Sequence, residues 1–367
     1  MKVLFQTRIN LFKAPGGDTI QILKTKEYLE KKGFEVDISL DFEPNLAEYD
    51  IVHLFNLMEP QDIYRQMVNA KKQNKKIVLS TIYGLYTEFE RNARGGLFQK
   101  LANLLNPYQI QYIRLIIKHF YEKRFHKGIY QMIWKGYYNM LKEIAKNTDV
   151  FLPNSVSEMR RIENELKLKN YNFISIPNSI DKSIFNDDLP SEKYSQYKDC
   201  ILCAARIEGR KSTLNLVKAV KDTKYKLVLV GNESKNQKKY VEEVHKQAGE
   251  NVYFLGAISH NDLKDLYKVA KVHVLASWME TPGLSSLEAA VMGCNIVVTE
   301  KGDTFEYFED YAFYCDPNDY KSIRSAIDIA FNTPVNQKLK EKILNNYTWE
   351  KTVEETIKAY QLAMKKK

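Results

Sequence analysis

Short apolar runs alternate with longer mixed stretches along most of the chain. The runs are apolar at successive positions, which is typical of strands buried on both faces of a parallel sheet. The longer stretches have a helical pattern and lie near residues 20–32, 61–73, 213–221, 235–247 and 261–269. The apolar runs are KVLFQ, EVDIS, DIVHLF, KIVLSTI and DVFLPNS in the first half, and CILCAA, KLVLVG, VYFLG, VHVLAS, NIVVTE and AFYCDP in the second.

Because this alternation occurs twice, the pattern predicts an α/β protein with two tandem Rossmann-like, doubly wound parallel-sheet domains. A chain of 367 residues is long enough for two cores, since single cores stop growing near about 250 to 300 residues. The boundary falls at IPNSID, where Pro177 and Asn178 break the pattern. We therefore predict domains at 1–178 and 179–348. Ligands collect at the carboxyl ends of parallel strands, so two such domains facing each other would enclose a cleft.

The segment SWMETPGLSSLEAAVMGC places Glu280 and Glu288 on either side of a turn that opens a helix. A helix begins with unpaired N–H groups and a positive dipole end, which together attract a phosphate. Glu288, about one turn into the helix, could accept hydrogen bonds from a ribose. The alternative is purely structural, because Ser285 and Glu288 have the spacing of a capping box.

Two further turns follow predicted strands. ARIEGRKS supplies Arg206, Arg210 and Lys211 just before a helix, where the cations could hold a diphosphate. KAPGGD places Gly16 and Gly17 before the first helix, where missing β-carbons let backbone N–H groups approach a phosphate or a sugar. Each turn could also be an ordinary surface feature.

Composition indicates the cellular compartment in which the protein works. Four cysteines in 367 residues indicate a reducing compartment, and Cys200 and Cys203 should point to opposite faces of one strand. The N-terminal apolar run is too short for a signal peptide, and no run reaches the roughly 20 residues of a bilayer span. We therefore expect a cytoplasmic protein, either free or peripheral on the inner face of the plasma membrane.

The net charge of +9 is concentrated in the first half of the chain. Residues 65–146 contain 16 Lys and Arg but only four acidic residues, and residues 106–146 interleave that charge with aromatic side chains. Basic helices with aromatic edges are typical of segments that lie on anionic membranes. The same composition would suit RNA binding by stacking and phosphate contacts, or a solvated helix that covers its own core.

Four motifs in order then resemble the retaining family-4 glycosyltransferases of GT-B fold. They are the spacing from Arg206 to Lys211, the boundary PNSID, the E-x7-E of Glu280 and Glu288, and the closing YTWEKTVEETIKAY. In the first domain the resemblance depends only on Gly16-Gly17 and on the overall architecture. It implies that the final helix, residues 349–367, crosses back to pack on the first domain.

The resemblance also implies roles for individual residues in binding a nucleoside-diphosphate sugar. Arg206 and Lys211 would bind the donor diphosphate, and Glu288 the ribose. Glu280 would meet the sugar and phosphates together with the backbone at Gly283 and Leu284. Arg206, Lys211 and Glu280 are the expected catalytic residues, and Gly16 and Gly17 are expected to approach the donor from the first domain.

The sequence departs from that family in three places. It has Glu280-Thr281-Pro282-Gly283-Leu284-Ser285 where E-G-F-G-L-P is common, and Lys211-Ser212 where K-G is common. LSTIYGLYTE lacks the His that many members have after the fourth strand, which leaves Thr81 or Tyr83 as candidates to contact the sugar.

The expected activity is transfer of a hexose, with retention of configuration, to a glycan or glycolipid acceptor that is lipid-linked, in surface polysaccharide or glycolipid biosynthesis. No Asp-x-Asp or H-E-x-x-H motif is present, so we expect no metal and no cofactor besides the donor. No nucleic acid is expected as a partner. The alternatives are a GT-B sugar-nucleotide epimerase and a non-catalytic RNA-binding protein that uses the basic, Tyr-rich face.

Overall fold

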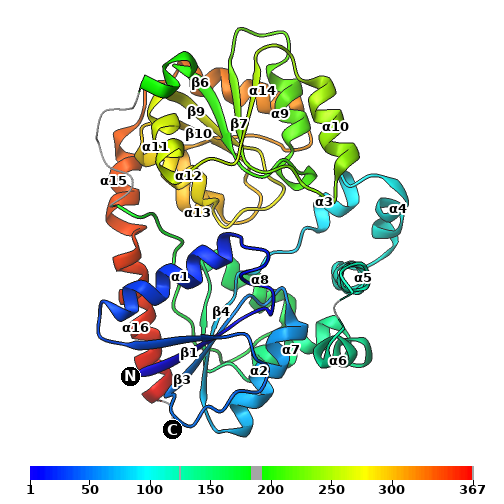
Figure 1. Cartoon of the computed structure of the whole chain (residues 1–367), viewed down its shortest axis with the longest axis vertical. Coiled ribbons are helices and arrows are strands. Elements are labelled where there is room, and N and C mark those ends of the chain that lie inside the picture. The colour runs from blue at the N-terminus through cyan, green and yellow to red at the C-terminus, as the bar shows by residue number, and fades with distance from the viewer. Residues whose placement is uncertain (124, 183–191, 366–367) are drawn as a thin grey trace. The chain divides into compact units, whose positions relative to one another are not determined.

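The computed structural model describes residues 1–123, 125–182 and 192–365, which form two compact units (Figure 1). Unit 1 comprises Met1–Thr87, Leu101–Asn178 and Trp349–Lys367, and unit 2 comprises Glu88–Lys100 and Ser179–Thr348. Each unit contains one parallel β-sheet with helices on both faces. The predicted fold class, two tandem Rossmann-like domains, is confirmed.

Unit 1 is built on a five-stranded parallel sheet in the order β2-β1-β3-β4-β5. Successive side chains of each strand enter different cores, so that Leu4 lies in one core while Val3 and Phe5 lie in the other. This two-sided burial is the reason why the strand sequences are apolar at successive positions. The strands are β1 (Lys2–Gln6), β2 (Glu35–Ser39), β3 (Ile51–Phe55), β4 (Lys76–Ser80) and β5 (Val150–Leu152).

Helices cover both faces of this sheet. Helices α2 (Pro60–Lys72), α7 (Tyr137–Lys146) and α8 (Val156–Leu166) bury apolar residues against one face, and α1 (Gly17–Glu30) and α16 (Trp349–Lys365) against the other. The Tyr360 hydroxyl of α16 lies 2.7 Å from His53 Nδ1, and His53 Nε2 lies 2.9 Å from Ser80 Oγ. Burial lowers the pKa of His53 to about 3, so this histidine is neutral. The final helix is thus part of the core of unit 1.

Between β4 and α7 the described residues form the helices α3 (Thr87–Asn92), α4 (Gly96–Leu104), α5 (Pro107–Tyr121) and α6 (Lys127–Lys135). Their assignment corrects the predicted boundaries, because residues 88–100 group with unit 2. Phe89 is buried, with its ring 6.3 Å from that of Trp278, and Glu88 forms an ion pair of 2.6 Å with Lys301. These contacts join segments that are far apart in the sequence, so they cannot be predicted from a local sequence pattern.

Unit 2 is built on a six-stranded parallel sheet in the order β11-β10-β9-β6-β7-β8. Cys200 and Cys203 of β6 lie in the cores on opposite faces, as predicted, and neither forms a disulfide. The strands are β6 (Cys200–Ala204), β7 (Leu227–Val230), β8 (Val252–Gly256), β9 (Ala270–Leu275), β10 (Asn295–Val298) and β11 (Phe313–Tyr314).

The helices of unit 2 pack on the two faces of this sheet. Helices α9 (Thr213–Val220), α10 (Lys238–Gln247) and α14 (Tyr320–Asn332) cover one face. The other face is covered by α11 (His260–Val269), α12 (Leu284–Val291), α13 (Thr304–Phe308) and α15 (Gln337–Asn346). Short 3-10 turns occur at Glu192–Tyr197, Gly209–Lys211 and Glu309–Tyr311. Throughout the described part of the chain, each helix is too short or too polar to cross a bilayer.

Candidate functional site

Lys211 and Glu280, which are 69 residues apart in the sequence, form an ion pair in unit 2 through Lys211 Nζ and Glu280 Oε1. Lys211 ends the 3-10 turn after β6, and Glu280 follows β9. These two strands are neighbours in the parallel sheet, so their carboxyl ends bring the two side chains together at one edge. The side chains are 23% and 11% exposed, which leaves the pair within reach of a ligand.

The backbone of Glu280 is held by the loop that follows β10. Glu280 N donates to Lys301 O at 3.2 Å, and Asp303 N donates to Glu280 O at 2.9 Å. Gly302 lies between those partners with φ of +94°, and a β-carbon there would come within 2.2 Å of Glu280 O. Three strand ends, those of β6, β9 and β10, therefore fix this ion pair.

Helix α12 begins directly after Glu280 and the cis peptide bond between Thr281 and Pro282. Its N-cap residue is Gly283, with φ of +91° and no side-chain capping hydrogen bond. Ser285 lies inside the helix, so the capping-box alternative for Ser285 and Glu288 is wrong. An amino end without a side-chain cap keeps its positive dipole available to an anion.

Glu288 lies in the second turn of α12, where it is half-buried. Its Oε2 accepts a hydrogen bond of 3.1 Å from the Tyr267 hydroxyl. Burial raises the pKa of Glu288 to about 7, and the Tyr267 hydrogen bond opposes that shift only in part. The carboxyl group can therefore change its charge near neutral pH and still has oxygen atoms with which to accept hydrogen bonds from a diol.

The cations of the β6 turn differ in their surroundings. Arg210 Nη2 lies 2.8 Å from Glu208 Oε1, so its charge is matched inside unit 2. Arg206 is exposed and forms no ion pair or side-chain hydrogen bond with another residue of the described ranges. The turn thus presents one unmatched cation, Arg206, beside the cation of the Lys211–Glu280 pair.

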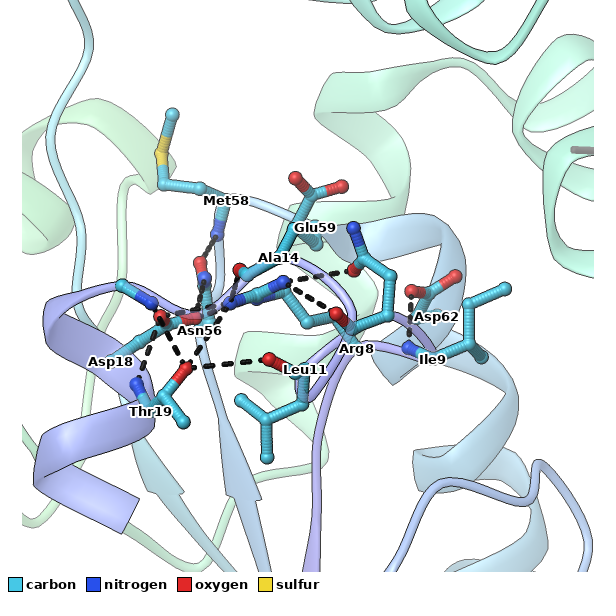
Figure 2. Close-up of polar contacts among 12 residues, drawn as sticks. Arg8, Ile9, Leu11, Ala14, Asp18, Thr19, Asn56, Met58, Glu59 and Asp62 are labelled. Carbon is cyan, nitrogen blue, oxygen red and sulfur yellow. Dashed lines mark hydrogen bonds and ion pairs between the residues drawn. The ribbon is translucent and has the colours of Figure 1, made fainter. Parts of the chain in front are cut away.

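Gly16 and Gly17 lie in unit 1, at the start of α1. Figure 2 shows how the Arg8 guanidinium holds the loop before them, with Nε 2.7 Å from Asp18 Oδ2 and Nη2 2.9 Å from Ala14 O. Gly16 N donates to Thr19 Oγ1 at 3.1 Å. A β-carbon at Gly17 would meet no atom within 4 Å, so packing within the protein does not require glycine there. The participation of these glycines in donor binding stays a prediction.

The polar cluster around that loop was not predicted from the sequence. Arg8 and Asp18 form a buried ion pair, with side chains 8% and 11% exposed. Asn56 Nδ2 donates to Asp18 Oδ2 at 3.3 Å, and Ile9 N donates to Asp62 Oδ2 at 3.2 Å (Figure 2). A single arginine after a strand forms no motif, so only the three-dimensional structure identifies it as the residue that shapes this loop.

Thr81 and Tyr83, the candidates to replace the expected histidine, are both buried in unit 1. The Thr81 hydroxyl donates to Glu158 Oε1 at 2.5 Å, and the Tyr83 hydroxyl donates to Glu165 Oε2 at 2.5 Å. Each hydroxyl already has a partner, and at most 1% of either residue is exposed. Their side chains therefore support the end of β4 and offer no surface to a sugar.

Comparison with known proteins identifies the family to which unit 2 is similar. Residues 186–349 match the family model described as glycosyl transferases group 1. Over 148 residues the chain is 32% identical to an uncharacterized glycosyltransferase of Methanocaldococcus jannaschii. That match covers 38% of this chain and spans only 37% of the relative.

Solved structures extend the likeness to the whole chain. Sucrose-phosphate synthase from Thermosynechococcus elongatus superposes with a TM-score of 0.75 at 16% identity, covering 100% of both chains. Anabaena HepE in complex with UDP and glucose gives a TM-score of 0.71 at 13% identity, covering 98% of this chain and 99% of its own. Such identities establish the fold alone. With the family match, they confirm the predicted resemblance to glycosyltransferases of GT-B fold. The narrower assignment to family 4 stays a prediction.

The close approach of Gly302 to Glu280 O leads to a prediction about the free energy of unfolding. Gly302→Ala should destabilise the protein more than Gly293→Ala, although φ is +94° at Gly302 and +93° at Gly293. Both variants place a side chain in the left-handed region, at a cost of about 1–2 kcal/mol. Only the first also drives a β-carbon into Glu280 O, which should add about 1–3 kcal/mol. Urea unfolding of both variants measures the difference, and equal destabilisation would contradict the role of Gly302.

Proposed function

We propose that this chain, whose residues 186–349 carry a group 1 glycosyl transferase domain within a GT-B fold, is a retaining family-4 glycosyltransferase. It would transfer a hexosyl group from a nucleoside-diphosphate sugar to a glycan acceptor in surface polysaccharide or glycolipid biosynthesis. The observation that carries the proposal is the Lys211–Glu280 ion pair at the amino end of α12. It brings together a cation, a carboxylate and a helix dipole inside the region that matches the family.

The donor diphosphate would dock against Arg206, Lys211 and the amino end of α12. Arg206 has no acidic partner in the described ranges, and an arginine can contact two phosphate oxygens at once. Lys211 would turn from Glu280 toward the phosphates, while Glu280 would accept hydrogen bonds from sugar hydroxyls. Within the described residues, no group of three or more His, Cys, Asp and Glu side chains is placed to hold a metal ion. We propose that the two cations and the helix neutralise the charge of the diphosphate.

During transfer, the bond between the anomeric carbon and the diphosphate oxygen would break as the acceptor oxygen bonds to the same carbon from the same face. The departing phosphate would take the proton from the acceptor hydroxyl, so charge and atoms balance without a further base. Arg206, Lys211 and the helix would stabilise the charge that develops on the leaving group. A product with inverted anomeric configuration would contradict this step.

Donor binding tests the proposal directly. A matching nucleoside diphosphate, sought among UDP, GDP, dTDP and ADP, should raise the melting temperature, because ligand at 100 times its Kd adds about 2.7 kcal/mol of stability. Arg206→Ala and Lys211→Ala should each weaken binding about 10- to 100-fold, as expected for the loss of a hydrogen bond to a charged group. Lys221→Ala is the matched control, since it removes an exposed cation at the other end of α9.

Equal affinity in all four proteins would place the diphosphate elsewhere, and the absence of any shift with all four nucleotides would reject the donor site. Conversion of the sugar nucleotide without an acceptor would favour the epimerase alternative instead.

The raised pKa of Glu288 predicts a pH dependence of donor binding. Ribose hydroxyls donate to an ionised carboxylate, so binding should lower the pKa of Glu288 from about 7 and release a proton. Affinity should then fall as the pH drops from 7 to 6, by up to about tenfold per unit. Titration calorimetry of the wild type and Glu288→Gln at each pH isolates this effect from the ionisation of the phosphate itself. The two pH profiles would run in parallel if Glu288 did not contact the ribose.

The exposed apolar side chains of α4, α5 and α6 support peripheral attachment to a membrane. Among them Leu104 is 85%, Phe120 70% and Trp134 92% exposed. Phe125 is also exposed, and its ring lies 6.3 Å from that of Phe120 and 6.4 Å from that of Tyr130. Solvent exposure of several large apolar groups beside lysines is typical of membrane-binding surfaces. We therefore propose that the acceptor is lipid-linked.

Vesicle sedimentation tests this attachment. Phe120→Ser with Trp134→Ser should strongly reduce binding to vesicles that contain anionic lipid, because both exposed side chains would otherwise enter the interface. Lys123→Gln with Lys127→Gln should weaken binding by about 1 kcal/mol per lysine, and less at high salt. Ile329→Ser is the control, since Ile329 is 56% exposed on α14 of unit 2. If the first two variants sedimented with vesicles as the wild type does, the proposed membrane attachment would be wrong.

A further inference from the structure

A cavity of about 460 Å³ lies within unit 1, between the first turns of α5 and the start of α7. This volume is within the range of about 300–1,000 Å³ that is usual for small-molecule sites. Tyrosine rings and amide side chains line the cavity, together with Gly136, and none of the lining residues is charged. None of the residues assigned to donor binding contributes to it.

The tyrosine rings of the cavity are held in place by hydrogen bonds of their hydroxyl groups. Tyr108 OH donates to Glu165 Oε2 at 3.3 Å, and Tyr138 OH donates to the Glu165 carbonyl at 3.2 Å. These two rings lie 4.6 Å apart. Tyr112 OH donates to the Ile133 carbonyl at 3.2 Å. Because their orientations are fixed in advance, the rings would lose little conformational freedom when a ligand binds.

The amide side chains that line the cavity use only some of their hydrogen-bonding groups within the protein. Asn106 Oδ1 caps α5 by accepting from Tyr108 N and Gln109 N, both at 3.0 Å. Gln109 Oε1 accepts from Asn106 N at 3.0 Å, and Asn139 Nδ2 donates to Lys135 O at 2.9 Å. Within the described residues this leaves Asn106 Nδ2 and Gln109 Nε2 as donors and Asn139 Oδ1 as an acceptor, without protein partners.

We propose that this cavity binds a neutral sugar ring of the acceptor glycan. The C–H face of a pyranose packs on an aromatic ring, while its hydroxyl groups both donate and accept hydrogen bonds, as amides require. An anionic ligand would find no cation on the lining, and an acyl chain would make no hydrogen bond with the amide groups. The identification of the sugar as part of an acceptor rests on the proposed glycosyltransferase function.

Saturation-transfer NMR of the full chain with methyl glycosides of neutral hexoses and N-acetylhexosamines tests the inference. At least one glycoside should receive saturation through its ring protons. Tyr112→Ala should weaken its binding about tenfold, because an aromatic wall is removed, whereas Tyr112→Phe should preserve it. Tyr130→Ala is the control, since Tyr130 is an exposed tyrosine of α6 outside the cavity.

A second variant covers the case in which Tyr112→Ala does not fold. Asn139→Trp places a large side chain at an exposed position on the cavity lining, so it should block glycoside binding without removing a buried ring. Nucleoside diphosphate binding should be unchanged in every variant, which separates this test from that of the donor site.

Three results would overturn the inference. They are no saturation of any glycoside by the wild type, equal saturation in the wild type and Asn139→Trp, and loss of vesicle binding in Tyr112→Ala with glycoside binding intact. The last result would identify a lipid chain as the occupant. If glycosides bind to the cavity while no nucleotide binds to unit 2, the cavity is a sugar site but the proposed transferase function is wrong.

Discussion

The ion pair between Lys211 and Glu280 is the interaction on which the proposed site in unit 2 depends. Two side chains 69 residues apart meet because β6 and β9 are parallel neighbours whose carboxyl ends share an edge. The loop after β10 completes the support, since Gly302 allows Glu280 to form backbone hydrogen bonds with Lys301 and Asp303. Helix α12 begins at Leu284, shortly after Glu280, so its positive amino end follows this pair closely in the chain.

Charge balance gives this arrangement its proposed chemistry. Lys211 is matched by Glu280 and Arg210 by Glu208, so Arg206 adds one unmatched cation to a nearly neutral site. An incoming diphosphate would supply a negatively charged partner for Arg206. Once Lys211 has turned from Glu280 toward the phosphates, the cations and the helix would be in position, so little further reorganisation is needed when the leaving group develops charge. This is the physical basis of the transferase proposal.

The sequence predicted the sheet architecture well because strands buried on both faces must be apolar at successive positions, as in the Val3, Leu4 and Phe5 series. It could not predict that residues 88–100 group with unit 2, since that depends on Phe89 meeting Trp278 across a long separation. The S-x-x-E spacing of Ser285 and Glu288 suggested a cap, but a helix that starts after Gly283 places both residues inside it.

The aromatic segment illustrates a second limit of sequence reasoning. Composition marked residues 106–146 as basic and aromatic, yet it could not assign individual side chains to distinct environments. Phe120 and Trp134 are exposed, Tyr137 is buried, and Tyr112 lines the cavity of unit 1. The difference arises because packing within unit 1 buries some faces of α5, α6 and α7 and leaves others in solvent.

A crystal structure of the chain with its bound nucleoside diphosphate tests the central claim most directly. The account predicts phosphate oxygens within hydrogen-bonding distance of Lys211 Nζ and the Arg206 guanidinium, in front of the amino end of α12, with Glu288 on the ribose. A diphosphate bound away from these groups, or held there only through a divalent ion, would contradict it.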